Sequence, residues 1–276
     1  MAAQYNGATG DVSTLNGQLG SLGDYSLITQ ERAQKLDLVM HLIANSNQSL
    51  VVCGPKGIGK TTLIKILLER KNDAWQYCAL QGVLDLSFEN ILGQAAVAVK
   101  KADKTDAHAL DPARLLEQLE SQRNKLVLII DDAGQLAPGL ITALIDYAAA
   151  NTALRLVFAL TPDEVYIKIR SDRVLDDCYF VEIPPLSEKQ CGEFLQQLSA
   201  KSWIRLPVNT ISESIIESVY RETQGIPERI IAQRPSLAIA KKSDRALWLL
   251  IAAVVALVAI ALGVQWLSAS GHLQRG

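Results

Sequence analysis

The segment Gly54–Thr61 has a composition and spacing suited to binding phosphate. It reads GPKGIGKT, which matches G-x-x-x-x-G-K-[ST] and lies between an apolar run and a helical segment. Glycines let the backbone wrap a phosphate with its N–H groups turned inward, and the next helix N-terminus adds partial positive charge. Lys60 can reach the β- and γ-phosphates, and the Thr61 hydroxyl can bind Mg²⁺. The pattern predicts a site for ATP and Mg²⁺; an ordinary glycine turn is the alternative.

Two aspartates follow a second apolar run, Leu126–Ile130. Asp131 is predicted to bind Mg²⁺, directly or through water, at the C-terminal end of a strand. Asp132 stands where many ATPases have a glutamate that polarises the attacking water, and we predict that role for it. Because aspartate is one methylene shorter, the water must lie closer or hydrolysis is slow. The alternative for both acids is a solvated strand end.

Three further polar side chains are candidates for the same chemistry. Thr161 follows a third apolar run and can sense a γ-phosphate, but it can equally be a helix N-cap before Pro162. Arg170 or Arg173 can act as an arginine finger on a neighbouring subunit's nucleotide, and we assign this to Arg173. Arg229 can reach back to the nucleotide. The alternative for each arginine is an ordinary solvated side chain.

The elements that position these residues alternate along the chain. Short apolar runs indicate buried parallel strands, and amphipathic segments between them indicate helices, so we predict an α/β fold with a parallel sheet covered on both faces. Strands are predicted at Ser49–Cys53, Trp75–Leu80, Lys125–Ile130, Arg155–Leu160 and Tyr179–Ile183. Helices are predicted at residues 30–45, Lys60–Arg70, Phe88–Lys101, Pro112–Gln122, Pro138–Ala150 and Pro162–Arg170.

After Pro184 and Pro185 the pattern becomes helical only. Ser187–Gln190 and Thr210–Glu213 fit capping boxes that open two helices, and a third short helix is expected from Pro227. The predicted organisation is a flexible segment at 1–24, a P-loop ATPase core at 25–184, a helical lid at 185–235, a basic linker at 236–245, a transmembrane helix at 246–268 and a periplasmic tail at 269–276.

The membrane segment is predicted from residues 246–264, which are apolar throughout. At 1.5 Å rise per residue, such a helix approaches the roughly 30 Å thickness of the hydrocarbon layer. Lys241, Lys242 and Arg245 precede it, and the positive-inside rule then places residues 1–245 in the cytoplasm. We therefore expect a single-pass membrane protein, with the bilayer as one of its partners; the resemblance described below implies that this is a bacterial inner membrane. The alternative is a buried core helix.

The amino-acid composition excludes some classes of protein. The chain has 276 residues, of which 49% are hydrophobic and 20% are charged, so it is not disordered by composition. A formal net charge of −2 argues against a dedicated nucleic-acid binder, and no nucleic-acid partner is expected. The four cysteines lack C-x-x-C spacing, which indicates reduced thiols, and three scattered histidines suggest no metal site.

With both acidic and phosphate-binding motifs in place, the chain resembles AAA+ ATPases. More narrowly, it resembles membrane-tethered ATPases of the ExeA/GspA secretion type and the ATPase part of DamX-like cell-division proteins. The resemblance implies a sheet order of 5-1-4-3-2, ATP-dependent homo-oligomerisation and a role in assembling a secretion, pilus or division machine. Together with the loop motif and the candidates above, the predicted nucleotide-binding residues are Gly54, Pro55, Lys56, Gly57, Ile58, Gly59, Lys60, Thr61, Thr62, Thr161 and Arg229.

The chain departs from that resemblance at three places. Asp132 replaces the usual glutamate, and Glu228 precedes Arg229, so the lid arginine comes one residue late. Such proteins usually continue into a periplasmic peptidoglycan-binding domain, whereas this sequence stops shortly after the membrane segment. The sequence is then a fragment, or it works through an envelope or division protein that binds peptidoglycan.

The sequence thus leaves three functional hypotheses. The first is a membrane-anchored ATPase in which Lys60, Asp132 and Arg173 are catalytic, while Thr61 and Asp131 bind Mg²⁺. The second is a nucleotide-gated scaffold whose hydrolysis is negligible because Asp132 is short. The third is a DNA-transposition accessory ATPase, which would require a basic face that binds DNA in a salt-sensitive way.

Overall fold

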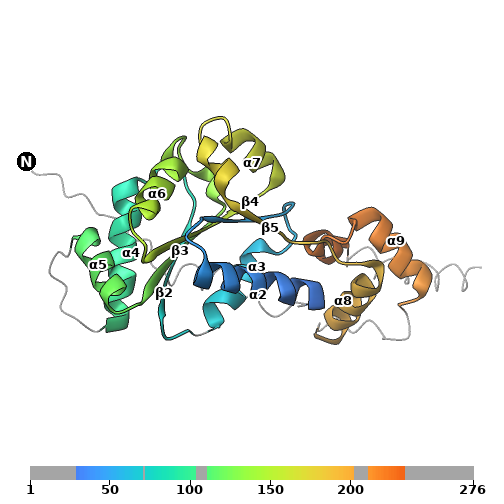
Figure 1. Ribbon diagram of the computed structural model, residues 1–276. Coiled ribbons are helices and arrows are strands. Elements are labelled where there is room, and N and C mark those ends of the chain that lie inside the picture. Colours follow the sequence, from blue (N-terminus) through green and yellow to red (C-terminus); the bar gives the residue numbers. More distant parts are fainter. Residues whose placement is uncertain (1–28, 71, 104–110, 202–210, 234–276) are drawn as a thin grey trace, which may run out of the picture.

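The fold is an α/β sandwich followed by a small helical unit (Figure 1). The computed structural model describes residues 29–70, 72–103, 111–201 and 211–233. In that part of the chain one sheet of five parallel strands has the order β2-β3-β4-β1-β5, which confirms the order that the resemblance implies. The strands are β1 (Leu50–Cys53), β2 (Trp75–Gln81), β3 (Lys125–Asp131), β4 (Leu154–Leu160) and β5 (Tyr179–Glu182). Each prediction is confirmed to within one residue at either end.

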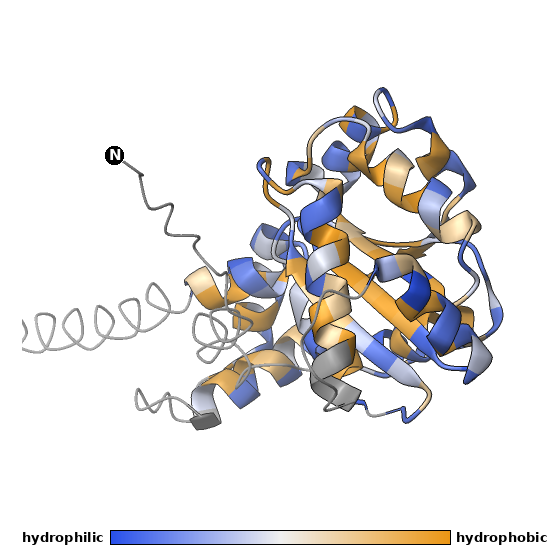
Figure 2. Ribbon diagram, turned by 90° about the vertical axis from the view of Figure 1, so that its left-hand side faces the viewer, coloured by the Kyte–Doolittle hydropathy of each residue, from blue (hydrophilic) through white to orange (hydrophobic). Residues whose placement is uncertain are grey.

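Helices cover both faces of the sheet, as predicted. One face carries α2 (Gln30–Asn45) and α3 (Lys60–Glu69). The other carries α4 (Phe88–Asp103), α5 (Pro112–Ser121), α6 (Leu140–Ala149) and α7 (Pro162–Lys168). The strands between these layers are the most hydrophobic part of the view in Figure 2.

The side chains of strand β3 show why helices must pack on both faces of the sheet. Leu128 and Ile130 belong to the hydrophobic core on the α4–α6 side, whereas Val127 and Ile129 belong to the core on the α2–α3 side. All four are fully buried, and each contributes roughly 1.5–3 kcal/mol through burial. Because successive side chains of a strand point to opposite faces, an unbroken apolar run fits only a strand buried on both sides.

Two helix boundaries differ from their predictions for a shared reason. Helix α6 begins at Leu140 rather than Pro138, after Gly139, whose φ is +83°. The Asp172 carboxylate accepts hydrogen bonds from the amides of Gly139 and Thr142, so it caps this helix from a distant turn. Helix α7 ends at Lys168 rather than Arg170, because the chain must turn to bring Asp172 into place.

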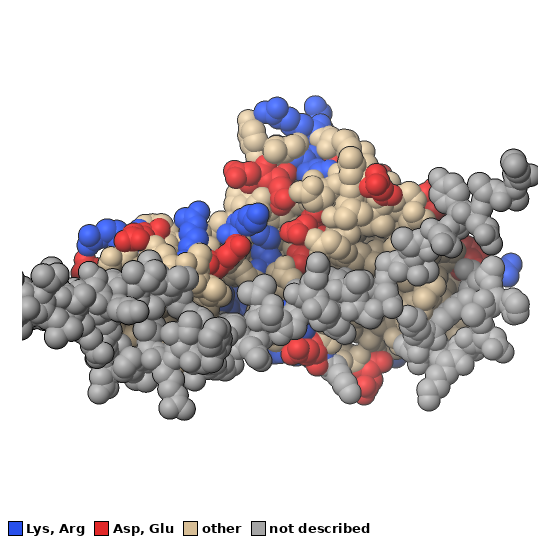
Figure 3. Space-filling view, turned by 180° about the vertical axis from the view of Figure 1, so that it is seen from behind, with Lys and Arg blue, Asp and Glu red and all other residues tan. Residues whose placement is uncertain are grey.

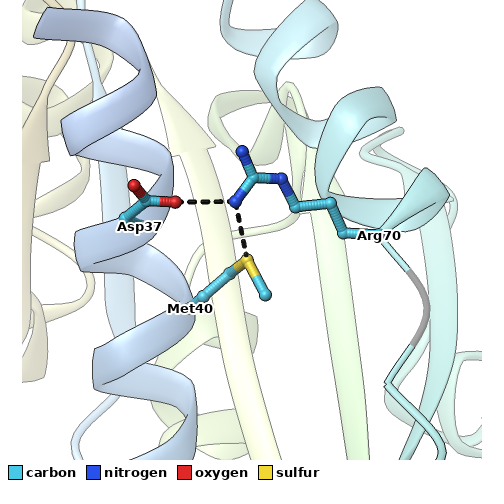
Figure 4. A network of polar contacts seen from close by, with 3 residues as sticks. All are labelled: Asp37, Met40 and Arg70. Atoms are coloured by element: carbon cyan, nitrogen blue, oxygen red, sulfur yellow. Dashed lines mark hydrogen bonds and ion pairs between the residues drawn. The ribbon is translucent and has the colours of Figure 1, made fainter. Parts of the chain in front are cut away.

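Helices α2 and α3 are joined by a contact at the surface. Arg70, which follows α3, forms an ion pair of 2.6 Å with Asp37 of α2 and contacts the Met40 sulfur at 3.6 Å (Figure 4). Both charged side chains are substantially exposed, so the ion pair contributes at most about 1 kcal/mol. The burial of Leu36, Val39 and Ile43 holds α2 in place more strongly.

The helical unit after β5 has a hydrophobic cluster of its own. It consists of α8 (Glu188–Lys201), α9 (Glu213–Thr223) and the helical residues 227–233, and lies beyond the β5 edge of the sheet (Figure 1). The buried members of its cluster are Leu186, Cys191, Phe194, Leu195, Leu198, Val219 and Ile230. We call this unit the lid, as the sequence analysis does.

The lid tests two predicted capping boxes. Ser187 and Gln190 form the first as predicted: the Gln190 amide donates to the Ser187 hydroxyl at 3.3 Å, and the Ser187 amide donates to Gln190 Oε1 at 2.9 Å. The second is wrong, because α9 begins at Glu213 with Ser212 as its N-cap, so Thr210 cannot cap it. The third helix starts at Pro227 as predicted.

Some predictions fall on other parts of the chain. The segment 1–24, the linker 236–245, the span 246–268 and the tail 269–276 lie outside the described residues. Among the helices that are described, none combines the length and the hydrophobicity needed to cross a bilayer. All four cysteines are described and free, in agreement with the predicted reduced thiols.

Candidate active site

The phosphate-binding segment connects β1 to α3 at the carboxyl end of the sheet. Gly57 and Gly59 have φ values of +78° and +109°, a region that favours glycine. Gly59 is the N-cap of α3 and offers no side-chain acceptor, so backbone amides of the first turn are not capped by it. Free amides at a helix N-terminus form a binding site for anions. The loop therefore has the backbone geometry that its sequence predicts.

Lys60 brings a positive charge into this loop. Only 7% of its surface is exposed, and its Nζ donates hydrogen bonds to the carbonyl oxygens of Gly54 at 2.9 Å and Pro55 at 3.4 Å. An ammonium group buried among carbonyl dipoles and helix amides suits an anionic ligand. Lys60 therefore lies within the loop that is predicted to bind phosphate.

Thr61 and Asp131 meet although they are far apart in sequence. The Thr61 hydroxyl donates to Asp131 Oδ2 at 2.5 Å, and Asp131 Oδ1 accepts from the Asp132 amide at 3.1 Å. Burial raises the pKa of Asp131, although the Thr61 hydrogen bond opposes that shift. The contact arises because β1 and β3 run parallel with only β4 between them, so their carboxyl ends share one edge of the sheet.

The same two side chains fit a magnesium ion. A hydroxyl and a carboxylate are hard oxygen ligands, and Mg²⁺ is commonly held by one or two protein groups together with phosphate oxygens and water. No group of three or more His, Cys, Asp or Glu side chains suited to a metal occurs in the described segments. The donor set thus fits a cation shared with a phosphate ligand rather than an all-protein metal site.

Asp132 is held by a residue that the sequence analysis missed. Gln81, the last residue of β2, donates from Nε2 to Asp132 Oδ2 at 2.6 Å. Asp132 itself has left-handed backbone angles, with φ 49° and ψ 42°, which turn its side chain out of the strand direction. Strand register explains the contact, because Gln81 is paired with Asp131 across β2 and β3. A strand-end amide carries no motif by which to recognise it.

Thr161 follows β4 at the same edge of the sheet. It forms a capping box with Glu164: its hydroxyl accepts from the Glu164 amide at 3.3 Å, and its amide donates to Glu164 Oε2 at 2.7 Å. The N-cap alternative is therefore confirmed. A contact with γ-phosphate stays a prediction, for which β4 places Thr161 between the strands that carry the two motifs.

The structure does not bring the two predicted arginines to the loop. Arg173 and Arg229 are exposed, and neither forms a hydrogen bond or ion pair with the phosphate-binding segment within the described residues. The lid instead reaches the loop through Glu228, whose amide donates to the Gly57 carbonyl at 3.3 Å. Arg229 is one position away from that contact.

Arg32 is a second residue that the sequence analysis missed. Its Nη1 lies 3.3 Å from the position that a Cβ on Gly59 would occupy, and its Nη2 donates to the Pro184 carbonyl at 3.3 Å. Burial lowers the pKa of Arg32, and its Nε has no hydrogen-bond partner in the described part of the chain. Arg32 lines a small pocket beside the loop, together with Leu36, Gly59, Thr62, Leu63, Ile66 and Ile183.

Solved structures share this fold at low sequence identity. Cdc6p from Pyrobaculum aerophilum has a TM-score of 0.52 and 18% identity over 81% of this chain. Hsp104 from S. cerevisiae in complex with casein has a TM-score of 0.51 and 16% identity over 81%. Drosophila ORC bound to DNA has a TM-score of 0.52 and 14% identity over 82%. The chain spans 66%, 40% and 64% of their respective lengths, and these likenesses concern the fold alone.

The shared fold of these structures agrees with the sheet order and helical layers described above. A comparison with curated protein sequences gives no match. A family model described as an ATPase domain predominantly from Archaea matches residues 30–232. That match includes the phosphate-binding loop, the acidic pair and the lid. Because it covers well over half of the chain, this protein belongs to that family of ATPase domains.

Proposed function

We propose that the protein is a membrane-anchored cytoplasmic ATPase that binds ATP with Mg²⁺ and hydrolyses it. The 2.5 Å contact between the Thr61 hydroxyl and Asp131 Oδ2 carries this proposal, because it joins the phosphate-binding loop to the acidic strand end. Thr61 and Asp131 would hold Mg²⁺, whose charge would offset that of the phosphates. The loop amides and Lys60 would bind the phosphates.

Asp132 has the proposed role of orienting the attacking water. It lies next to Asp131, it is exposed, and Gln81 fixes the direction of its carboxylate. Arg173 would act across an oligomer, because it is exposed and away from its own loop. The turn that carries Arg173 is anchored by Asp172, whose carboxylate accepts hydrogen bonds from the backbone amides of Gly139 and Thr142. The architecture of AAA+ neighbours supports a homo-oligomer as the working form.

Membrane anchoring and an envelope role are part of the same proposal. The apolar residues 246–264, with basic residues before them, support a single-pass anchor in a bacterial inner membrane. The order of ATPase core, lid and membrane segment supports a relationship to the ExeA/GspA or DamX-like ATPases. An envelope or division protein, with peptidoglycan-binding capacity of its own, would then be the partner that carries the signal outward.

Nucleic acid is not the proposed partner. On the face shown in Figure 3, Lys and Arg side chains are interspersed with Asp and Glu side chains over the described part of the surface. A DNA-binding ATPase would be expected to gather its basic residues on one face. The mixed charge of this face and the formal net charge of −2 both speak against a DNA-transposition accessory role.

A nucleotide-gated scaffold is the second candidate, and the Gln81–Asp132 contact favours it. An amide that donates to Asp132 Oδ2 occupies one of the two oxygens with which this short side chain can accept from water. In such a scaffold, ATP binding would order the core and oligomer while turnover stayed negligible.

Phosphate release from ATP by the full chain in detergent or nanodiscs tests the proposal. We expect Mg²⁺-dependent turnover that falls at least 100-fold in Lys60→Ala, together with weaker binding of ATP. Lys189→Ala, an exposed lysine of α8, is the matched control and should behave as wild type. Binding without measurable turnover by the assembled wild type would favour the scaffold. Equal ATP affinity in wild type and Lys60→Ala would reject both nucleotide proposals.

A further inference from the structure

The lid places a carboxylate against the phosphate-binding loop. A Cβ built on Gly57 would lie 2.2 Å from Glu228 Oε2 and 2.5 Å from Glu228 Cβ, so this side chain occupies the space beside the glycine. The Glu228 amide also donates to the Gly57 carbonyl at 3.3 Å. Backbone and side chain of Glu228 therefore both contact the loop that is built to hold anions.

Packing on either side fixes Glu228 in this position. Ile226 is 6% exposed and belongs to the core between the sheet and helices α2 and α3. Ile230, one turn later, is fully buried in the cluster of the lid. Gly225, with φ +70°, lies so close to Leu186 that a Cβ there would be 2.1 Å from the Leu186 carbonyl oxygen. Glu228 is thus presented by a packed turn rather than by a free end.

The charge of Glu228 is not neutralised by a neighbour. Within the described residues, no Lys or Arg side chain forms an ion pair with it. The cationic group of the loop, Lys60, donates to the carbonyls of Gly54 and Pro55 instead. Glu228 is exposed, but a polyphosphate bound in this loop would still meet its negative charge close by, and the repulsion grows with the charge of the ligand.

We propose that Glu228 is a specificity-determining residue of the nucleotide site, which weakens the binding of ATP more than that of ADP. The inference rests on the ATPase function proposed above. ATP carries one more negative charge than ADP, so a carboxylate beside the loop repels ATP more strongly. The ratio of ATP affinity to ADP affinity is therefore lower than it would be without this charge. ATP then displaces bound ADP less readily than it would if residue 228 were neutral.

Equilibrium binding of ATP and of ADP, each with Mg²⁺, to the full chain in detergent tests this inference. In Glu228→Gln, which keeps the shape and removes the charge, we expect ATP affinity to rise about 5- to 10-fold and ADP affinity about 2- to 3-fold. Both gains should shrink at high salt, since screening weakens the repulsion. Glu193→Gln, an exposed glutamate of α8, is the matched control and should leave both affinities unchanged.

Glu228→Ala separates charge from space, because it removes the side chain that lies against Gly57. Tighter ATP binding in both Glu228 variants supports the inference. Tighter binding in Glu228→Ala alone would show that space is limiting and would overturn it, as would equal changes for ATP and ADP. If the wild type binds neither nucleotide, the proposed function fails and this inference with it. If the wild type binds both and Glu228→Gln matches it, only the inference fails.

Discussion

Gln81 Nε2 lies 2.6 Å from Asp132 Oδ2, so the end of β2 restrains the residue that follows β3. This hydrogen bond joins the side chain that we expect to orient water to an edge strand of the sheet. The positions of Lys60, Thr61 and Asp131 follow from two local motifs, whereas the direction of Asp132 depends on a third strand. The rate of hydrolysis should therefore be more sensitive to this contact than the affinity for nucleotide.

Substitution of Asp132 should change turnover with little effect on binding. In Asp132→Asn, turnover should fall about 100-fold, because an amide cannot accept a proton from water. In Asp132→Glu, it should rise, because the added methylene lets the carboxylate reach a water that lies farther out. Steady-state phosphate release and nucleotide affinity measure the two effects. Asp73→Asn, an exposed acid before β2, is the control, and unchanged turnover in Asp132→Asn would remove the assigned role.

Arg32 should contribute to nucleotide affinity. Its guanidinium is largely desolvated beside Gly59 and has no ion-pair partner among the described residues, so an anionic ligand would satisfy it. We expect Arg32→Met to lower ATP affinity about 10-fold while the ligand-free protein keeps its thermal stability. Titration with ATP and thermal unfolding measure the two. Arg114→Met, on α5 across the sheet, should alter neither; unchanged ATP affinity in Arg32→Met would contradict the assignment.

Asp172 should stabilise the fold, and its contribution should depend on pH. Burial opposes its ionisation, but hydrogen bonds from Ser171, Thr142 and Gly139 outweigh burial and lower its pKa. The ionised carboxylate therefore adds stability above the ordinary aspartate pKa, and this is lost as pH falls through the lowered value. At pH 7, Asp172→Asn should reduce the free energy of unfolding by about 1–3 kcal/mol.

Urea unfolding of wild type and Asp172→Asn at neutral and acidic pH measures this difference. The gap between the two proteins should narrow toward acid, because the wild-type carboxylate becomes protonated there. Asp176→Asn, an exposed acid in the next turn, is the control. A gap that is independent of pH would show that the ionised form is not what stabilises α6.

Arg173 should act between subunits. Arg173→Ala and Lys60→Ala should each reduce turnover by at least 100-fold, because each removes one half of the proposed site. A mixture of the two variants should regain part of the activity, since some interfaces would combine an intact Lys60 with an intact Arg173. Phosphate release as a function of mixing ratio gives the result. A mixture that stays as inactive as its components would contradict the proposed action of Arg173 across the subunit interface.

The apolar runs and the two motifs predicted the sheet and the residues Thr61 and Asp131, and the family resemblance supplied the strand order. The apolar runs are unambiguous because β3 and β4 are buried on both faces. Thr61 and Asp131 meet because parallel strands bring their carboxyl ends to one edge. Local spacing encodes the strands and the two motifs, whereas the contact between Thr61 and Asp131 also depends on the strand order, in which only β4 separates β1 from β3.

The residues that the sequence did not reveal have no motif of their own. Gln81 acquires its role from strand register, Arg32 from the packing of α2 against the loop, and Glu228 from the docking of the lid. Thr210 illustrates the same limit: Thr210 and Glu213 match the capping-box spacing, yet Ser212, which lacks that pattern, is the residue that precedes α9. Such roles depend on segments that meet only in the folded chain.

Because the lid has a hydrophobic cluster of its own, a rotation of the lid relative to the sheet would cost little free energy. Because the buried side chains of α8 and α9 pack with one another, turning the lid about Pro184 and Pro185 would expose neither the lid's cluster nor most of the cores around the sheet. The movement would disrupt only the joint, chiefly the burial of Ile226 and the bond between Glu228 and Gly57. A few interactions at this joint, of the size that one bound nucleotide can supply or oppose, would therefore set the position of the lid if it turns.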